Sequence, residues 1–248
     1  MIALVQTGPA FVIDAASFGV ASLALFFVSG GRRHPDHAET RPGVLATIGS
    51  GISAAWADPA VRSMVLLTAA FNFAFTGPVS VGLAFLADHR FDGGPATFGL
   101  LFSAFGGGAV LGAIAGGSLR PRRLGGVVLV IALALGVGLG LIGLAPTVPV
   151  ALAVIGVMGV LIGFINVQAI AWLQSRVAPD MRGRVMSLVT LGSVGLAPIS
   201  LAIAGVLVDV GAVTLIFLAG GAIIILATLA GFAWGVPTHM VWPDDETT

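Results

Sequence analysis

Long apolar runs with almost no charge are the feature that most constrains this chain. A helix of about 20 apolar residues can cross the roughly 30 Å hydrocarbon core of a bilayer. Seven runs of this kind cover residues 8–30, 61–86, 96–119, 125–145, 148–174, 185–208 and 212–235. Charged residues make up only 9% of the chain, whereas soluble domains contain about 25%. The runs therefore predict an integral membrane protein.

The length of the runs selects helices over strands. Strands of a membrane barrel are about 10 residues long and alternate apolar with polar residues, whereas these runs are longer and apolar on all sides. We therefore expect an all-α bundle with seven transmembrane helices.

The arginines predict an orientation. Ten of the eleven lie on alternate connections, and Arg90 alone lies on the other set. Because basic residues concentrate in cytoplasmic loops, we expect Met1 outside the cell and Thr248 in the cytoplasm. The runs divide the chain into a helix over residues 1–30, a cytoplasmic linker with an interfacial helix over 31–60, a six-helix part over 61–235 and a cytoplasmic tail over 236–248.

Polar residues separate inner from outer helices, because polar side chains in a span should face other helices or a cavity. The run 61–86 carries Thr68, Asn72, Thr76 and Ser80 on one face, and 185–208 carries a potential kink at Pro198. The runs 125–145 and 212–235 are nearly free of polar side chains and are expected to face lipid as outer supports. Glycines four apart in three of the runs predict close helix packing: Gly108, Gly112 and Gly116, Gly136 and Gly140, and Gly159 and Gly163.

A binding cavity between the inner helices is the first functional prediction. An apolar cavity with a few polar groups suits a small amphipathic molecule. The candidate residues are Asn72, Phe71, Phe75, Phe164, Asn166, Gln168 and Trp172. Asn166 and Gln168 point about 200° apart on a helix, so at most one can be a primary contact. The alternative for all of them is packing between helices.

Asp14 is the one ionisable residue well inside an apolar run. An intramembrane carboxylate is costly and often marks a proton or ion site, so Asp14 is the proton-coupling candidate. The alternative is a bond to a neighbouring helix near the outer surface.

Several classes are disfavoured. A seven-helix retinal protein holds its retinal on a lysine, and this chain has no lysine. It also has no cysteine, which excludes disulfides and thiolate metal sites. The four histidines lie in loops and tails, so we expect no metal site, no cofactor and no enzymatic activity. A net charge of zero gives no sign of nucleic-acid binding. The lipid bilayer is the expected surrounding.

Three segments resemble the major facilitator superfamily, most closely its bacterial drug and siderophore exporters. They are Gly8 to Phe18, Gly99 to Gly112 and Arg182 to Leu188. The resemblance implies the sixth span, the central loop and the second six-helix half of a twelve-helix transporter. It implies proton-coupled efflux of small amphipathic molecules by a partial chain, which either has a mis-set gene start or pairs with a separate N-terminal half. The alternative is a non-transporting membrane subunit or a truncated remnant.

The same resemblance suggests gating residues. The superfamily's loop signature, a glycine, an acid and a basic cluster, corresponds here to residues 116–125, where the acid is missing. Arg120 and Arg122 in this loop, with Arg182 and Arg184 at the start of a later run, are the gating candidates; the alternative for the loop pair is ordinary membrane anchoring.

Overall fold

The structure, a computed structural model, describes residues 7–27, 56–177 and 181–235. The chain divides into two compact units, residues 1–46 and 47–248, and each is described by itself. The first contains α1 (Thr7–Phe27), a helix of 21 residues where the first span was predicted. The predicted tail and most of the predicted linker lie outside the described residues.

Within its described residues, the regular elements of the second unit are all helices. Its elements are α3 (Pro59–Gly77), η1 (Pro78–Gly82), α4 (Leu83–Phe85), η2 (Leu86–Arg90), α5 (Gly94–Ser118), α6 (Leu124–Leu144), α7 (Val148–Arg176), α8 (Arg182–Val194), α9 (Ala197–Asp209) and α10 (Val213–Ala233). The α3 to η2 segment is one continuous helix that includes two wider π-helical turns, and α8 and α9 are two parts of one span. Six helices of this unit are long and apolar enough to cross a membrane, which confirms six of the predicted runs.

Local chemistry explains where several helices begin and end. Asp58 caps α3, because its side chain accepts hydrogen bonds from the backbone N–H groups of Ala60 and Val61. Prolines occupy the first positions of α3, α5, α7 and α9, where a missing N–H costs nothing. Gly211 and Gly235, which follow α9 and α10, have positive φ angles of 75° and 78°, a conformation that glycine adopts readily.

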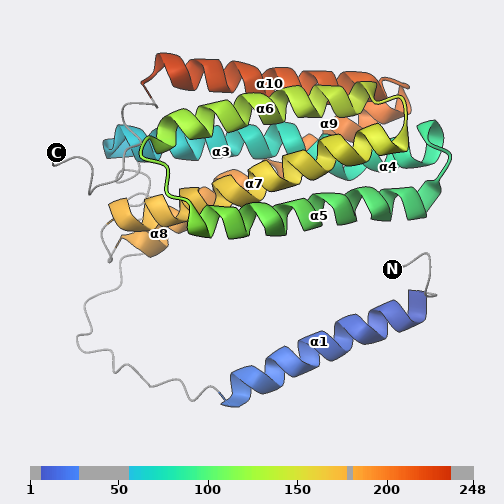
Figure 1. Cartoon of the computed structure of the whole chain (residues 1–248), viewed down its shortest axis with the longest axis horizontal. Helices are drawn as coiled ribbons and strands as arrows, with labels where there is room; N and C mark the ends of the chain where they lie inside the picture. The colour runs from blue at the N-terminus through green and yellow to red at the C-terminus, as the bar shows by residue number, and fades with distance from the viewer. Residues whose placement is uncertain (1–6, 28–55, 178–180, 236–248) are drawn as a thin grey trace. The chain divides into compact units, whose positions relative to one another are not determined.

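Two helix pairs form the frame of the bundle (Figure 1). α5 packs most extensively against α7, and α6 packs against α10, while α3 contacts α8, α9 and α10. In the first pair, a Cβ added to Gly116 would lie 2.9 Å from the carbonyl oxygen of Phe164, and one added to Gly163 would be closer still to that of Ala109. In the second, a Cβ on Gly221 would lie 2.5 Å from the carbonyl oxygen of Gly136. The predicted close packing of the glycines is confirmed for these pairs.

α6 and α10, predicted to face lipid as outer supports, bury more of their surface within this unit than α5 and the α8–α9 span do. In the most apolar 18 residues of each helix, 44% of α6 and 39% of α10 are buried, against 17% of α5 and 11% of the α8–α9 span. Glycines on their facing sides let α6 and α10 pack closely against each other without polar side chains. α5 and α8–α9 leave most of their surface uncovered by the described residues.

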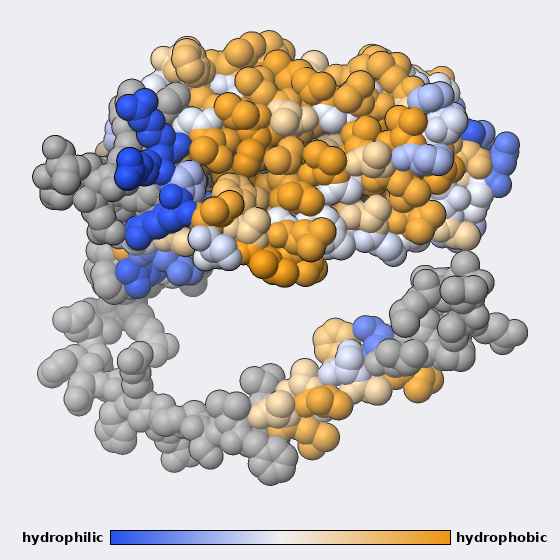
Figure 2. Space-filling view, in the orientation of Figure 1, coloured by the Kyte–Doolittle hydropathy of each residue, from blue (hydrophilic) through white to orange (hydrophobic). Residues whose placement is uncertain are grey.

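The surface of the bundle is apolar along its length and polar at its ends (Figure 2). One end, called here the basic end, carries the exposed residues Arg62, Arg120, Arg122, Arg123 and Arg182. The opposite end carries Asp88, His89 and Arg90. This distribution is typical of a bundle that lies across a bilayer.

Candidate functional site

Aromatic rings gather near the middle of α3 and α5. The rings of Phe71 and Phe75 stack with centroids 5.0 Å apart, and Phe75 lies 6.1 Å from Phe105 of α5. All three are partly buried and pack against the main apolar core. Phe75 lies midway along Pro59–Arg90 and Phe105 midway along Gly94–Ser118. Two of the predicted site residues, Phe71 and Phe75, therefore lie together at mid-depth in the bundle.

Asn72 lies between these rings in the sequence and is half-buried. Its side-chain Nδ2 donates a hydrogen bond of 2.9 Å to the carbonyl oxygen of Thr68, within the same helix. Its backbone carbonyl accepts a bond of 2.7 Å from the Thr76 hydroxyl. Within the described part of the chain no other helix bonds to its amide side chain, so its Oδ1 and one amide hydrogen retain bonding capacity.

Gln168 has the opposite surroundings. It is 3% exposed, and its Nε2 donates to the carbonyl oxygens of Gly116, at 2.9 Å, and of Leu119. Both amide hydrogens thus stabilise the end of α5. Trp172 is fully buried in a second apolar cluster at the basic end, together with residues that include Ala60. These contacts are typical of residues that pack between helices, which was the alternative left open by the sequence. Gln168 and Trp172 are therefore not included in the site proposed below.

Asn166 and Phe164 lie elsewhere on α7. Asn166 is exposed, so it and buried Gln168 occupy different sides of α7, as their spacing predicted. Phe164 is partly buried against the main core, and its backbone nitrogen would lie 2.9 Å from a Cβ on Gly112.

An ion pair joins two helices at the basic end. Arg176 Nε lies 2.9 Å from Asp58 Oδ2, and the guanidinium lies 5.9 Å from the centre of the Trp172 ring. Asp58 lies just outside the span, and burial of its carboxylate, taken alone, would raise its pKa. The hydrogen bond from Arg176, the amides at the start of α3 and the charge of Arg176 together outweigh burial, so the pKa of Asp58 is lowered from its ordinary value. The pair links the start of α3 to the end of α7.

The gating candidates lie at this same end. Arg120 and Arg122 are exposed. Arg182 Nε donates a 3.1 Å hydrogen bond to the carbonyl oxygen of Val177, the residue that caps α7. The side chain of Arg184 lies outside the described residues.

Asp14 lies on α1, where its side chain is exposed within this unit taken alone. Its backbone carbonyl accepts a 2.7 Å bond from the Ser17 hydroxyl.

Sequence reasoning missed three residues of interest. Phe105 belongs to the segment Gly99 to Gly112 but was not chosen as a site residue. Its position midway along an apolar run could have indicated that it lies at mid-depth. Asp58 was visible as a cap before a proline, but its partner Arg176 is 118 residues away. Ser200 is one of the polar residues that marked the run 185–208 as an inner helix, but nothing local identified its partner on α3.

Comparison with known proteins identifies the family. The sequence profile of the Major Facilitator Superfamily matches residues 1–199. The chain belongs to the Major Facilitator Superfamily. It is similar to the Multidrug efflux pump Tap of Mycobacterium tuberculosis (strain ATCC 25618 / H37Rv) and of Mycobacterium bovis (strain BCG / Pasteur 1173P2), with 27% identity over 224 residues.

The match covers 88% of this chain and 52% of each relative, so the chain spans about half the length of the curated relatives it matches. No solved structure gives a significant match. Membership of the Major Facilitator Superfamily, with similarity to a drug exporter, confirms the resemblance and supports a multi-pass membrane protein.

Proposed function

We propose that this chain acts in proton-coupled efflux of small amphipathic molecules of the drug or siderophore type, together with a separate N-terminal half. Transporters of this superfamily alternate access by rocking two halves around a midplane site. Similarity to multidrug efflux pumps over most of this chain supports the efflux direction and the substrate class.

The surroundings of Asn72 carry the proposal. A half-buried amide with spare hydrogen-bonding capacity lies beside the stacked rings of Phe71 and Phe75. An amphipathic molecule needs an apolar surface for its body and one or two polar groups for orientation. Asn166, an exposed polar residue on a membrane helix, is proposed as a further contact, because such residues favour a cavity over lipid. Phe164 is proposed as part of the apolar lining.

Exposed apolar side chains on the two least covered helices are evidence for a partner half. On α5, Leu111 and Ile114 are 65% and 63% exposed, and on the α8–α9 span Leu191 and Val206 are both 62% exposed. We propose that these faces pack against the N-terminal half. The basic end is proposed to face the cytoplasm, with Met1 outside and Thr248 inside, because ten arginines favour that side.

Proton coupling is assigned to Asp14. The six runs between residues 61 and 235 carry their ionisable side chains only at their ends, whereas Asp14 lies within an apolar helix. Arg120, Arg122, Arg182 and Arg184 are proposed to contact the partner half when the cytoplasmic side closes, because all four lie in segments at the basic end.

Dye efflux tests the proposal. The chain would be expressed in efflux-deficient cells, alone and with the N-terminal half of the mycobacterial relative, and the retention of a lipophilic cationic dye followed. We expect efflux only from the pair. Asn72→Ala should lower it about 5-fold, the value of one hydrogen bond of about 1 kcal/mol, at an unchanged protein level. The control is Ser118→Ala, which should leave efflux unchanged because the Ser118 hydroxyl bonds to Ile114 in its own helix.

Two outcomes would overturn parts of this assignment. No efflux from the co-expressed pair would favour a non-transporting subunit or a remnant. Efflux that survives Asp14→Asn with its dependence on the proton gradient intact would remove Asp14 from the coupling site.

A further inference from the structure

The α-helical hydrogen-bond ladder of the helix that carries the candidate site is interrupted one turn after Phe75. Pro78 has no N–H group, so the carbonyl oxygen of Ala74 lacks its usual helical donor. The backbone widens there into the π-helical turn η1. Gly220 of α10 lies against this carbonyl, since a Cβ on Gly220 would be 2.6 Å from Ala74 O. Proline and a π-helical turn are two known causes of helix bending.

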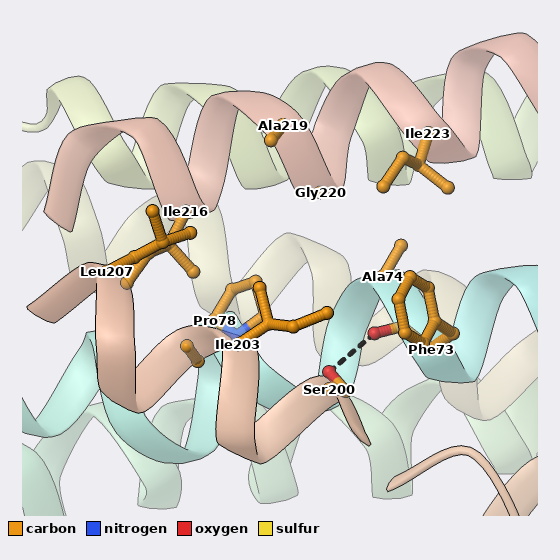
Figure 3. Close-up of a pocket in the computed structure, with 11 residues that line it drawn as sticks. Phe73, Ala74, Pro78, Ser200, Ile203, Leu207, Ile216, Ala219, Gly220 and Ile223 are labelled. Atoms are coloured by element: carbon orange, nitrogen blue, oxygen red, sulfur yellow. Dashed lines mark hydrogen bonds between the residues drawn. The ribbon is translucent and has the colours of Figure 1, made fainter. Parts of the chain in front are cut away.

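A third cause of bending acts at the same place. The Ser200 hydroxyl of α9 donates a 2.6 Å hydrogen bond to the carbonyl oxygen of Phe73, shown by the dashed line in Figure 3. The same hydroxyl accepts a 2.8 Å bond from the N–H of Gly77. Phe73 and Gly77 are four residues apart, the spacing of a helical hydrogen bond. Ser200 therefore bridges a donor and an acceptor of the α3 backbone ladder.

Only a very close approach permits this bridge. Ser200 is 5% exposed. A Cβ on Gly77 would lie 2.7 Å from the Ser200 carbonyl oxygen and 2.9 Å from its hydroxyl. Position 77 therefore requires a glycine for α9 to reach the α3 backbone.

Ser200 also lies just after the interruption of its own span. α8 ends at Val194, α9 starts at Ala197, and Pro198 occupies the first turn of α9. This break agrees with the predicted kink at Pro198. Ser200 thus bonds one interrupted span to the residues just before the π-helical turn of another.

A small cavity adjoins the bridge. It has a volume of about 60 Å³ and lies among α3, α9 and α10, with Ala74, Pro78, Ser200, Ala204, Ala219 and Gly220 in its lining (Figure 3). Unfilled volume beside small side chains gives α9 room to shift against α3, because close packing otherwise resists such movement.

We propose that Ser200 is a positioning residue that couples the bend of α3 to the break between α8 and α9. When the bridge is made, the two interrupted helices bend together. Without it, Phe73 and Gly77 bond to each other and α3 bends independently of α9. Because Asn72 and Phe75 lie within a turn of the bridge, Ser200 would set their position relative to Phe105; this last step rests on the proposed function.

Distances between spin labels in the full chain in lipid nanodiscs test the coupling. The chain contains no cysteine, so introduced pairs are labelled selectively. One pair, Leu66→Cys with Ala84→Cys, spans the bend of α3, and the other, Thr190→Cys with Val206→Cys, spans the α8–α9 break; all four positions are exposed. Ser200→Ala should replace the dominant distance of both pairs by broader distributions. Ser200→Thr, which keeps the hydroxyl, should restore both.

The matched control is Ser63→Ala. Ser63 is also 5% exposed, but its hydroxyl bonds to Pro59 in its own helix, so neither distribution should change. A change in only one pair, or in neither, with Ser200→Ala would overturn the coupling. If that variant does not fold, Ala219→Val, which fills the cavity and keeps the hydroxyl, should narrow both distributions; an unchanged width would overturn the proposal. Neither measurement uses transport, so failure of the coupling and failure of the proposed function are distinguishable.

Discussion

The contact between α5 and α7 makes a sharp prediction for Gly112→Ala. A Cβ at this position would lie 2.7 Å from the carbonyl carbon of Val160 and 2.9 Å from the nitrogen of Phe164, distances under 3.0 Å that real Cβ atoms essentially never show. Both neighbours are backbone atoms and cannot rotate away. The two helices must therefore separate at this point.

The size of the effect follows from the separation. Relief of the clash requires the 2.7 Å contact to reach at least 3.4 Å, the start of ordinary contact, and the carbonyl oxygen of Val160, which lies closer still, requires a larger separation. A gap of about 0.5–1 Å removes a quarter to a half of each van der Waals attraction, and overpacking typically costs about 1–3 kcal/mol. Alanine recovers about 0.5–1 kcal/mol because glycine is a poor helix residue. We expect Gly112→Ala to lower the free energy of unfolding by about 0–2.5 kcal/mol.

Gly107→Ala is the matched control. Gly107 lies in the same helix, and a Cβ there would meet nothing within 4 Å, so only the helix preference applies. The assay is reversible unfolding of the full chain in mixed micelles by added sodium dodecyl sulfate, followed by tryptophan fluorescence. The two variants should differ by about 1–3 kcal/mol. The reasoning is refuted if Gly112→Ala is as stable as Gly107→Ala.

Three further predictions use the same assay. Arg90→Met should destabilise the bundle by about 1 kcal/mol, because Arg90 donates bonds to the Gly143 carbonyl and the Thr214 hydroxyl; an unchanged midpoint would contradict these bonds. Gln168→Leu should cost about 1–3 kcal/mol through two unpaired carbonyls at the end of α5, and a neutral result would return Gln168 to the candidate site. Since the folded-state pKa of Asp58 is lowered, its contribution is present above its ordinary pKa and lost as the pH falls through the folded value. The stability gap between the native chain and Asp58→Asn should therefore close in acid; a pH-independent gap would refute it.

Much of the fold could be predicted because membrane helices are specified locally. The apolar runs placed the six spans of the second unit within a few residues of their observed bounds, since a bilayer requires continuous apolar length. Pro198 placed the break between α8 and α9, because proline interrupts the helical ladder. The glycine ridges predicted close approach, although they did not say which helices would meet.

The candidate site was harder to predict, because its decisive contacts join distant residues. Asn72 and Gln168 are both amides in apolar runs, and no local pattern separates them. Only the proximity of Gly116 and Leu119 identifies Gln168 as a packing residue. The bond between Ser200 and Phe73 spans 127 residues, so its partner depends on how α9 crosses α3. The pairing of α6 with α10 could not be predicted for the same reason, because the glycine face of α6 could contact lipid or a partner helix equally well.

The pairing of α6 with α10 has a consequence for biosynthesis. A ribosome delivers helices to the membrane in chain order, so α6 enters before α7, α8–α9 and finally α10. Its glycine face at Gly136 receives Gly221 only when the last helix arrives. Until then, α6 exposes to lipid, or to a membrane chaperone, the surface it later buries most. Release of the final helix is thus the step that completes the bundle, and a nascent chain that stops before Val213 leaves the frame open.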